Sequence, residues 1–315
     1  MDNGLLVVSG SPHIHARGTT SGLMWRVVFA LMPALVCALY YFGIGAAVVV
    51  STAVLGCMAV EYVIARWLMR RDVGFVNGAA ALTGLLLAFN LPSNLPVWMV
   101  LIGCVVAIGV GKMAFGGLGC NIFNPALVGR VFLLLSFPAA MTSWPLPEVN
   151  RLTYLDATTG ATVLSGLGDG TVSFDVVGET LGCTGGSLGE VGALALVAGV
   201  VFLLLTRVIT WHIPVAVLGT VVLFAMAIGS NVGVELLSGG LLLGAFFMAT
   251  DYVTSPMSKW GCVIYGVMIG VITMVIRHWG AYPEGVSFAI LIMNGFTPLI
   301  NRYVKPRKFG ERRCR

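Results

Sequence analysis

The chain has 315 residues, of which 58% are hydrophobic and only 10% are charged, and its mean hydropathy is +0.95. Soluble domains carry about 25% charged residues, so the composition excludes an ordinary soluble protein and indicates an integral membrane protein. Residues 1–22 are mildly polar and the first apolar run lacks a small-residue cleavage site, so we expect no secretory signal peptide.

About ten apolar stretches are candidate membrane spans, since a helix needs about 20 apolar residues to cross a hydrocarbon core of about 30 Å. Several of them are short or are interrupted by glycine and proline. The sequence therefore predicts an all-α polytopic membrane protein with about ten transmembrane helices. In chain order the candidates are residues 24–42, 45–67, 75–91, 96–114, 121–139, 191–206, 213–229, 236–250, 260–276 and 285–303.

Basic residues gather on one side of these spans. If ten spans alternate in direction, fifteen of the eighteen lysines and arginines fall on the same face, which the positive-inside rule assigns to the cytoplasm. Both termini, residues 1–22 and 304–315, are then cytoplasmic. The basic tail resembles a nucleic-acid-binding patch in composition, but next to a membrane span we attribute it to topology and anionic membrane lipid, and we expect no nucleic-acid partner.

The same alternation places residues 141–190 in one long periplasmic loop. The loop holds the polar stretch Asp156-Ala-Thr-Thr-Gly-Ala-Thr162, in which small residues and hydroxyls dominate. A threonine hydroxyl is a weak nucleophile, but an activated phosphate can esterify it when another enzyme supplies the activation. Such an acceptor needs an accessible, extended segment without bulky neighbours. The alternative is an ordinary loop, because threonine and glycine are common in loops.

Two stretches of the chain, residues 78–91 and 239–251, resemble one another as short, glycine-containing spans that end in polar residues. They divide the membrane part into two halves of five spans each, residues 23–140 and 191–303. Because five is odd, the second half is inverted in the membrane, and inverted repeats with interrupted helices form sites at their interface. The alternative is that glycine-rich membrane helices resemble one another by composition alone.

Asn121 and Asn124 open the fifth predicted span. They lie one helical turn apart, so a helix would present both amides on one face. Asn124 precedes Pro125 and is also a good helix N-cap, which is a purely structural role. In the functional interpretation, both amides hydrogen-bond a polar ligand that faces the bundle.

Three further residues have chemistry that the apolar spans do not explain. Arg130 lies within a span, where a charge is expensive and usually functional, and we expect it to pair with an acid of this chain such as Glu61 or Asp251, or with a neighbouring subunit. His13 and His15 belong to the N-terminal segment. Two alternating histidines suit either a metal ion or the docking of a partner, and the sequence leaves both open.

Three motifs, in this order on a multispan protein, resemble the D subunit of the Rnf complex (ferredoxin:NAD oxidoreductase). That protein is related to the B subunit of the sodium-pumping NADH:quinone reductase. The motifs are Asn-Gly-Ala-Ala-Ala-Leu-Thr-Gly-Leu-Leu-Leu-Ala from Asn77, Gly-Cys-Asn-Ile-Phe-Asn-Pro-Ala from Gly119, and the stretch that ends at Thr162. The resemblance covers nearly the full length of the chain.

The resemblance implies that a periplasmic flavin transferase joins the phosphate of FMN to the hydroxyl of Thr162. The remaining residues of the motif, with Asp156, Thr159, Gly160 and Ala161 as site residues, would be read by that enzyme. The periplasmic loop is then the flavin-carrying segment of the chain. Its predicted outer location, argued from charge alone, agrees with the compartment in which the transferase works.

The resemblance also implies a second, non-covalent flavin (riboflavin) near the cytoplasmic face, for which Asn121 and Asn124 are the candidates. The expected function is electron transfer through covalent FMN, between ferredoxin and NAD, inside a multisubunit ion-translocating complex of the cell inner membrane. Its partners would be membrane, iron–sulfur and flavin subunits. We assign no catalytic acid, base or nucleophile to the chain. The alternatives are a solute channel or transporter built on inverted repeats, and a structural membrane anchor.

Overall fold

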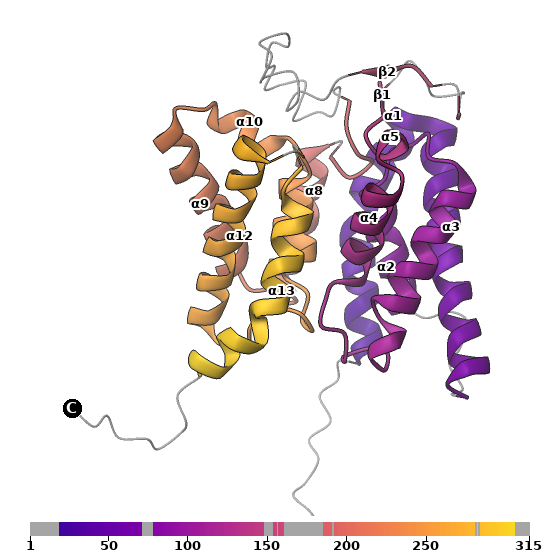
Figure 1. The fold of residues 1–315 in the computed structure, drawn as a ribbon, viewed down its shortest axis with the longest axis horizontal. Helices are drawn as coiled ribbons and strands as arrows, with labels where there is room; N and C mark the ends of the chain where they lie inside the picture. Colours follow the sequence, from indigo (N-terminus) through magenta and orange to yellow (C-terminus); the bar gives the residue numbers. More distant parts are fainter. Residues whose placement is uncertain are drawn as a thin grey trace, which may run out of the picture.

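The structure, a computed structural model, describes residues 19–70, 78–147, 154–155, 157–160, 185–190, 192–280, 282 and 284–305. In this part of the chain almost all regular structure is helical. The helices that precede residue 142 and those that follow residue 192 form two adjacent groups, called here the first and second halves (Figure 1). Helix α1 begins and helix α13 ends at one end of the bundle, the terminal end, and the two short strands lie at the opposite end, the loop end (Figure 1).

The chain reverses its direction inside the first helical element, α1 (Thr20–Val63), at Gly43. Gly43 has φ +57° and ψ −126°, a conformation that glycine alone adopts without strain. A Cβ added to Gly78 would lie 2.9 Å from Trp25, and one added to Gly84, further along the same helix, would lie 2.6 Å from Ala53. In an unbroken helix Trp25 and Ala53 would be about 42 Å apart. The element therefore consists of two antiparallel segments, which match the predicted spans 24–42 and 45–67.

The first half continues around one almost completely buried helix. This helix, α2 (Gly78–Phe89), packs against both segments of α1, and Gly84 allows the backbones to approach closely. The remaining elements are η1 (Ile64–Leu68), α3 (Val97–Val105), η2 (Val106–Val110), η3 (Met113–Phe115), α4 (Pro125–Ser136) and α5 (Pro138–Met141). At the loop end, β1 (Trp144–Pro145) pairs antiparallel with β2 (Thr159–Gly160).

The second half is organised by one long helix, α12 (Lys259–Trp279), which packs against α9 (His212–Ile228) and α13 (Val286–Tyr303). Gly266 and Gly270 lie one turn apart on α12, and added Cβ atoms there would come within 2.7 Å of Ala216 and 2.8 Å of Thr220. Such small-residue contacts are typical of membrane helix pairs. The other elements are α8 (Ala193–Leu205), α10 (Val232–Leu237), α11 (Leu241–Leu243) and η4 (Gly244–Met248).

The lengths of these helices qualify the predicted spans. Among the described residues, three segments are long and apolar enough to cross a membrane: Thr20–Leu68, Val97–Phe115 and Lys259–Trp279. Each predicted range contains described helix, but α2 and α4, with 12 residues each, are only about 18 Å long. The predicted span 236–250 is divided among α10, α11 and η4. The all-helical membrane class is thus confirmed, while the count of ten and the inverted repeat stay predictions.

Six of the seven tryptophans lie at or near the ends of helices, and the seventh, Trp144, is buried in β1. Trp25 is in the second turn of α1, Trp67 is in η1, and Trp211 immediately precedes α9, while Trp98, Trp260 and Trp279 are terminal or next-to-terminal residues of α3 and α12. All six are exposed on the surface of the chain. Tryptophan is enriched where a membrane meets water, so these exposed positions agree with the membrane class.

Candidate functional site

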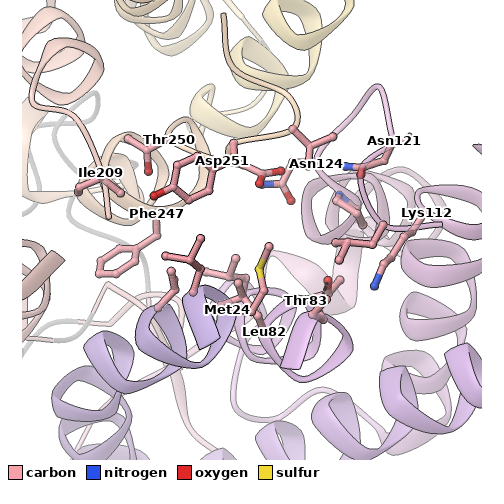
Figure 2. A pocket seen from close by; sticks show the side chains of 18 of the residues that line it. Met24, Leu82, Thr83, Lys112, Asn121, Asn124, Ile209, Phe247, Thr250 and Asp251 are labelled. Carbon is pink, nitrogen blue, oxygen red and sulfur yellow. Dashed lines mark hydrogen bonds between the residues drawn. The ribbon is translucent and has the colours of Figure 1, made fainter. Parts of the chain in front are cut away.

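A cavity lies between the two halves at the terminal end of the bundle (Figure 2). It encloses about 780 Å³ of space between atoms, part of it open to the surroundings. Its lining is largely apolar, with a few polar side chains, which is the composition of a small-molecule site. The first half contributes Met24, Leu82, Thr83, Lys112, Asn121 and Asn124, and the second half contributes Ile209, Phe247, Thr250 and Asp251 (Figure 2).

Asn124 combines the two roles that the sequence left open. Its Oδ1 accepts a hydrogen bond from the backbone N–H of Ala126 at 3.1 Å, so it caps α4 as predicted. Its Nδ2 donates across the boundary between the halves to the backbone oxygen of Met248 at 3.2 Å. The residue is 3% exposed and lines the cavity. Capping therefore accounts for the oxygen, whereas the amide nitrogen belongs to the contact between the halves.

Asn121 lines the same cavity, but for a different reason from the one predicted. The expectation that a helix presents both amides on one face is wrong, because α4 begins at Pro125 and Asn121 lies in the preceding turn. Three glycines with positive φ, at 116, 117 and 119, shape that turn. Asn121 Nδ2 donates to the backbone oxygen of Phe123 at 3.0 Å. The turn, rather than the helix, brings the two asparagines together.

A buried ion pair that the sequence did not predict flanks the cavity. Lys112 Nζ lies 2.6 Å from Glu61 Oε2, and both side chains are more than nine-tenths buried. By its position in the sequence, Lys112 counts as an ordinary basic residue at the cytoplasmic end of a span. The signal that was available is Glu61, an acid inside an apolar stretch, which requires a cationic partner.

Arg130 pairs with an acid of this chain, as one of the predictions had it, but the two acids named as candidates are wrong. The structure pairs its guanidinium with Glu284, immediately before α13, instead of with Glu61 or Asp251. Arg130 Nη1 also donates to Asn90 Oδ1 at 2.8 Å and to Ser287 Oγ at 2.6 Å. Because Glu284 and Ser287 belong to the second half, this charge joins the two halves inside the bundle. Arg130 lies more than 150 positions before Glu284 and Ser287 in the sequence, so no local pattern indicates these contacts.

The threonine-rich motif lies at the loop end and is partly described. Thr159 and Gly160 form strand β2, with Trp144 opposite Gly160 and Pro145 opposite Thr159. Thr159 is exposed, so this part of the motif is extended and accessible, as predicted. Tyr154, five residues before β2, donates from its hydroxyl to Leu95 O at 2.5 Å. Asp156, Ala161 and Thr162 lie outside the described residues, as do His13 and His15.

The two candidate sites occupy opposite ends of the molecule. Asn121, Asn124 and Asp251 face the cavity at the terminal end (Figure 2), whereas β2 lies beyond the far end of α4 and α5 (Figure 1). The structure therefore brings the two asparagines together, and separates them from Thr159 and Gly160. No single bound group can contact both sets of residues.

Comparisons with known proteins agree over nearly the whole chain. The model of the NQR2, RnfD, RnfE family matches residues 7–310. The D subunit of the Na(+)-translocating ferredoxin:NAD(+) oxidoreductase complex of Acetobacterium woodii is 44% identical, over 97% of this chain and 95% of that protein. The proton-translocating counterpart of Clostridium ljungdahlii is 40% identical, over 98% and 97%. The D subunit of the ion-translocating oxidoreductase complex of Stutzerimonas stutzeri is 38% identical, over 94% and 93%.

Proposed function

This chain belongs to the NQR2, RnfD, RnfE family, and from that premise we propose that it is the flavin-carrying membrane subunit of an ion-translocating ferredoxin:NAD oxidoreductase complex. The observation that carries the proposal is the full-length match to proteins named as the D subunit of such complexes. Those names favour a redox complex over the solute transporter that the sequence left open. The partners are then the other membrane, iron–sulfur and flavin subunits of the complex.

The proposed cofactor is FMN bound through its phosphate to the hydroxyl oxygen of Thr162. The motif Asp156 to Thr162 supports this assignment, and so do the extended backbone of Thr159 and Gly160 and the exposure of Thr159. A flavin transferase needs an acceptor segment that it can reach, and two strand residues held at the rim of the bundle provide one. Once bound, FMN supplies the redox couple that no side chain of the chain offers.

A second, non-covalent flavin is proposed for the cavity at the terminal end. Asn121 and Asn124 each use one N–H on a backbone oxygen, and an amide has two, so each retains a donor. Neutral amides suit the edge of an isoalloxazine ring, which offers both donors and acceptors. The apolar lining from Leu82 and Phe247 suits the faces of the ring.

The proposed orientation places the terminal end in the cytoplasm and the loop end in the periplasm, in the cell inner membrane. The excess of lysine and arginine at the terminal end supports this orientation. The ten spans, the two inverted halves and the lipid contacts of the basic tail belong to the same proposal. Covalent FMN is then on the outer side, where the flavin transferase acts, and riboflavin is on the inner side.

The test is the covalent mass of the chain. We would coexpress it with the flavin transferase and measure the intact mass after denaturation. Wild type and the matched control Thr142→Ala, an exposed threonine outside the motif, should carry the FMN increment, and Thr162→Ala should lack it. Retention of the increment by Thr162→Ala overturns the assignment to that residue. Absence of the increment from wild type overturns covalent flavin as a whole.

A further inference from the structure

A second group of charged side chains lies towards the loop end, away from the cavity, and the turn that carries one of them begins beside Pro145 of β1. It contains three carboxylates, Glu190, Glu235 and Glu284, and two guanidiniums, Arg130 and Arg277. Glu190 lies in the turn 185–190, Glu235 lies in α10, and Glu284 immediately precedes α13. Arg130 and Arg277 lie in α4 and α12. With three negative and two positive charges, and with the neighbouring His278 counted as neutral, the group carries one surplus negative charge.

Two of the carboxylates have cationic partners. Arg277 Nη1 lies 2.8 Å from Glu235 Oε2, and Arg277 also donates to the backbone oxygens of Glu235 and Ser238. His278 Nε2 lies 3.1 Å from the other oxygen of Glu235. Glu284 pairs with Arg130. Each guanidinium is therefore already committed to one acid.

Glu190 is the carboxylate without such a partner. Its Oε1 accepts from Ser187 Oγ at 2.8 Å, and within the described ranges no ion pair joins it to a basic residue. Arg130 and Arg277 act on it only at longer range, and burial outweighs them, so the pKa of the Glu190 carboxyl lies above its ordinary value. The surplus charge of the group therefore resides on Glu190.

The backbone fixes Glu190 at the boundary between the two halves. Leu188 N and Gly189 N donate to the carbonyl oxygens of Leu91 and Phe89, at the end of α2, at 3.2 Å and 2.8 Å. A Cβ on Gly189 would lie within 2.8 Å of Leu243 in α11. The turn is thus held between an element of the first half and an element of the second half, and the Glu190 side chain cannot move far.

Unpartnered polar atoms surround the same group. Six buried side-chain nitrogen or oxygen atoms in the described part of the chain have no hydrogen-bond partner, and five belong to this group or adjoin it. Three are atoms of Arg130, Arg277 and Glu284. The other two are the hydroxyls of Ser238 and Thr273, residues that are 5% and 0% exposed. Buried hydroxyls need partners, and water supplies them in polar interiors.

We propose that this group is a proton-binding site, with Glu190 as the group that takes up the proton and water held by Ser238 and Thr273 as its hydrogen-bonded surroundings. The proton forms an O–H bond on the Glu190 carboxylate and cancels the surplus charge. A metal cation suits the site less well, because both neighbouring guanidiniums repel it and they already occupy the other two carboxylates. His278, one-quarter exposed, gives the group its contact with the loop-end surface.

The proposal goes beyond the redox role and uses the proposed function only for the membrane orientation. Infrared spectra of the purified complex, titrated with base, are expected to show loss of a protonated-carboxyl C=O band. Glu190→Gln should abolish that band, whereas Glu311→Gln, in the basic tail, should keep it. Ser187→Ala removes the hydroxyl that stabilises the carboxylate and should move the midpoint up by about one to two pH units.

A full band in Glu190→Gln overturns the proposal. Should that variant not assemble, an unchanged midpoint in Ser187→Ala overturns it equally. The covalent flavin of each sample is measured alongside. If the chain carries no covalent flavin but shows a titrating band that Glu190→Gln abolishes, only the proposed cofactor is rejected. If the complex carries covalent flavin but Glu190→Gln leaves the band unaltered, only the proton site is rejected.

Discussion

Asn124 illustrates how one side chain satisfies both a fold and a site. Its oxygen caps α4 and its nitrogen reaches Met248 in the other half. The sequence predicts the cap, because asparagine before proline is a local signal. It does not predict the bond to Met248, since that bond depends on packing between residues 124 positions apart. The same limit hid the partners of Lys112 and Arg130.

The double variant Asn121→Ala plus Asn124→Ser tests the cavity at the residue scale. Serine is a good N-cap, so α4 is preserved while both amides are lost. Each unpaired polar group of the flavin should cost about 1–3 kcal/mol, and acid-extractable flavin from the purified complex should fall well below wild type. Asn94→Ala is the matched control, because Asn94 bonds Ser143 far from the cavity. Wild-type flavin content in the double variant would leave the asparagines a structural role only.

At the scale of the elements, the sequence predicts the type and approximate position of the helices better than it predicts where each helix begins and ends. Apolar runs identify where helices lie, and each predicted span contains one. The ends of these helices depend on turns in the backbone, which the pattern of apolar residues does not indicate. Glycines at 116, 117 and 119 delay the start of α4, and Gly239 and Gly240, both with positive φ, separate α10 from α11. Strands β1 and β2 have two residues each, so they are too short to show an alternating apolar and polar pattern in the sequence.

Gly43→Ala should destabilise the fold at the element scale. An L-residue at φ +57° and ψ −126° is strained by about 1–3 kcal/mol, and the reversal between the two segments of α1 depends on that conformation. Gly219→Ala, on the exposed face of α9, has nothing within 4 Å of the added methyl and should melt like wild type. Thermal aggregation of the detergent-solubilised protein measures both. Equal melting temperatures would show that the reversal tolerates a side chain.

For the whole molecule, the pair formed by Arg130 and Glu284 is a charge contact that joins the two halves. Arg130→Met leaves Glu284 buried without its cation, which typically costs about 3–5 kcal/mol. Arg130→Met combined with Glu284→Gln removes both charges and should recover most of that loss. Folded yield after membrane extraction is the measurement. A double variant no better than the single one would mean that Arg130 acts through Asn90 and Ser287.

Orientation is also a property of the whole molecule, and the sequence argues it from charge alone. A reporter that is active only outside the cytoplasmic membrane, fused at Gly170, should give signal. The same reporter fused at Arg315 should give none, since the basic tail stays on the inner side. The opposite pattern would reverse the molecule and remove the argument for flavin attachment at Thr162.

The brevity of α2 has an electrical consequence. Thr83 lines the cavity and Phe89 holds the Glu190 turn, so along α2 only about 9 Å separates them, compared with a hydrocarbon core of about 30 Å. If water reaches the cavity from the cytoplasm and the Glu190 turn from the periplasm, most of the membrane voltage falls across this thin layer. A charge that crosses it does about 2.3 kcal/mol of electrical work per 100 mV. The local field is then roughly three times that of the surrounding lipid.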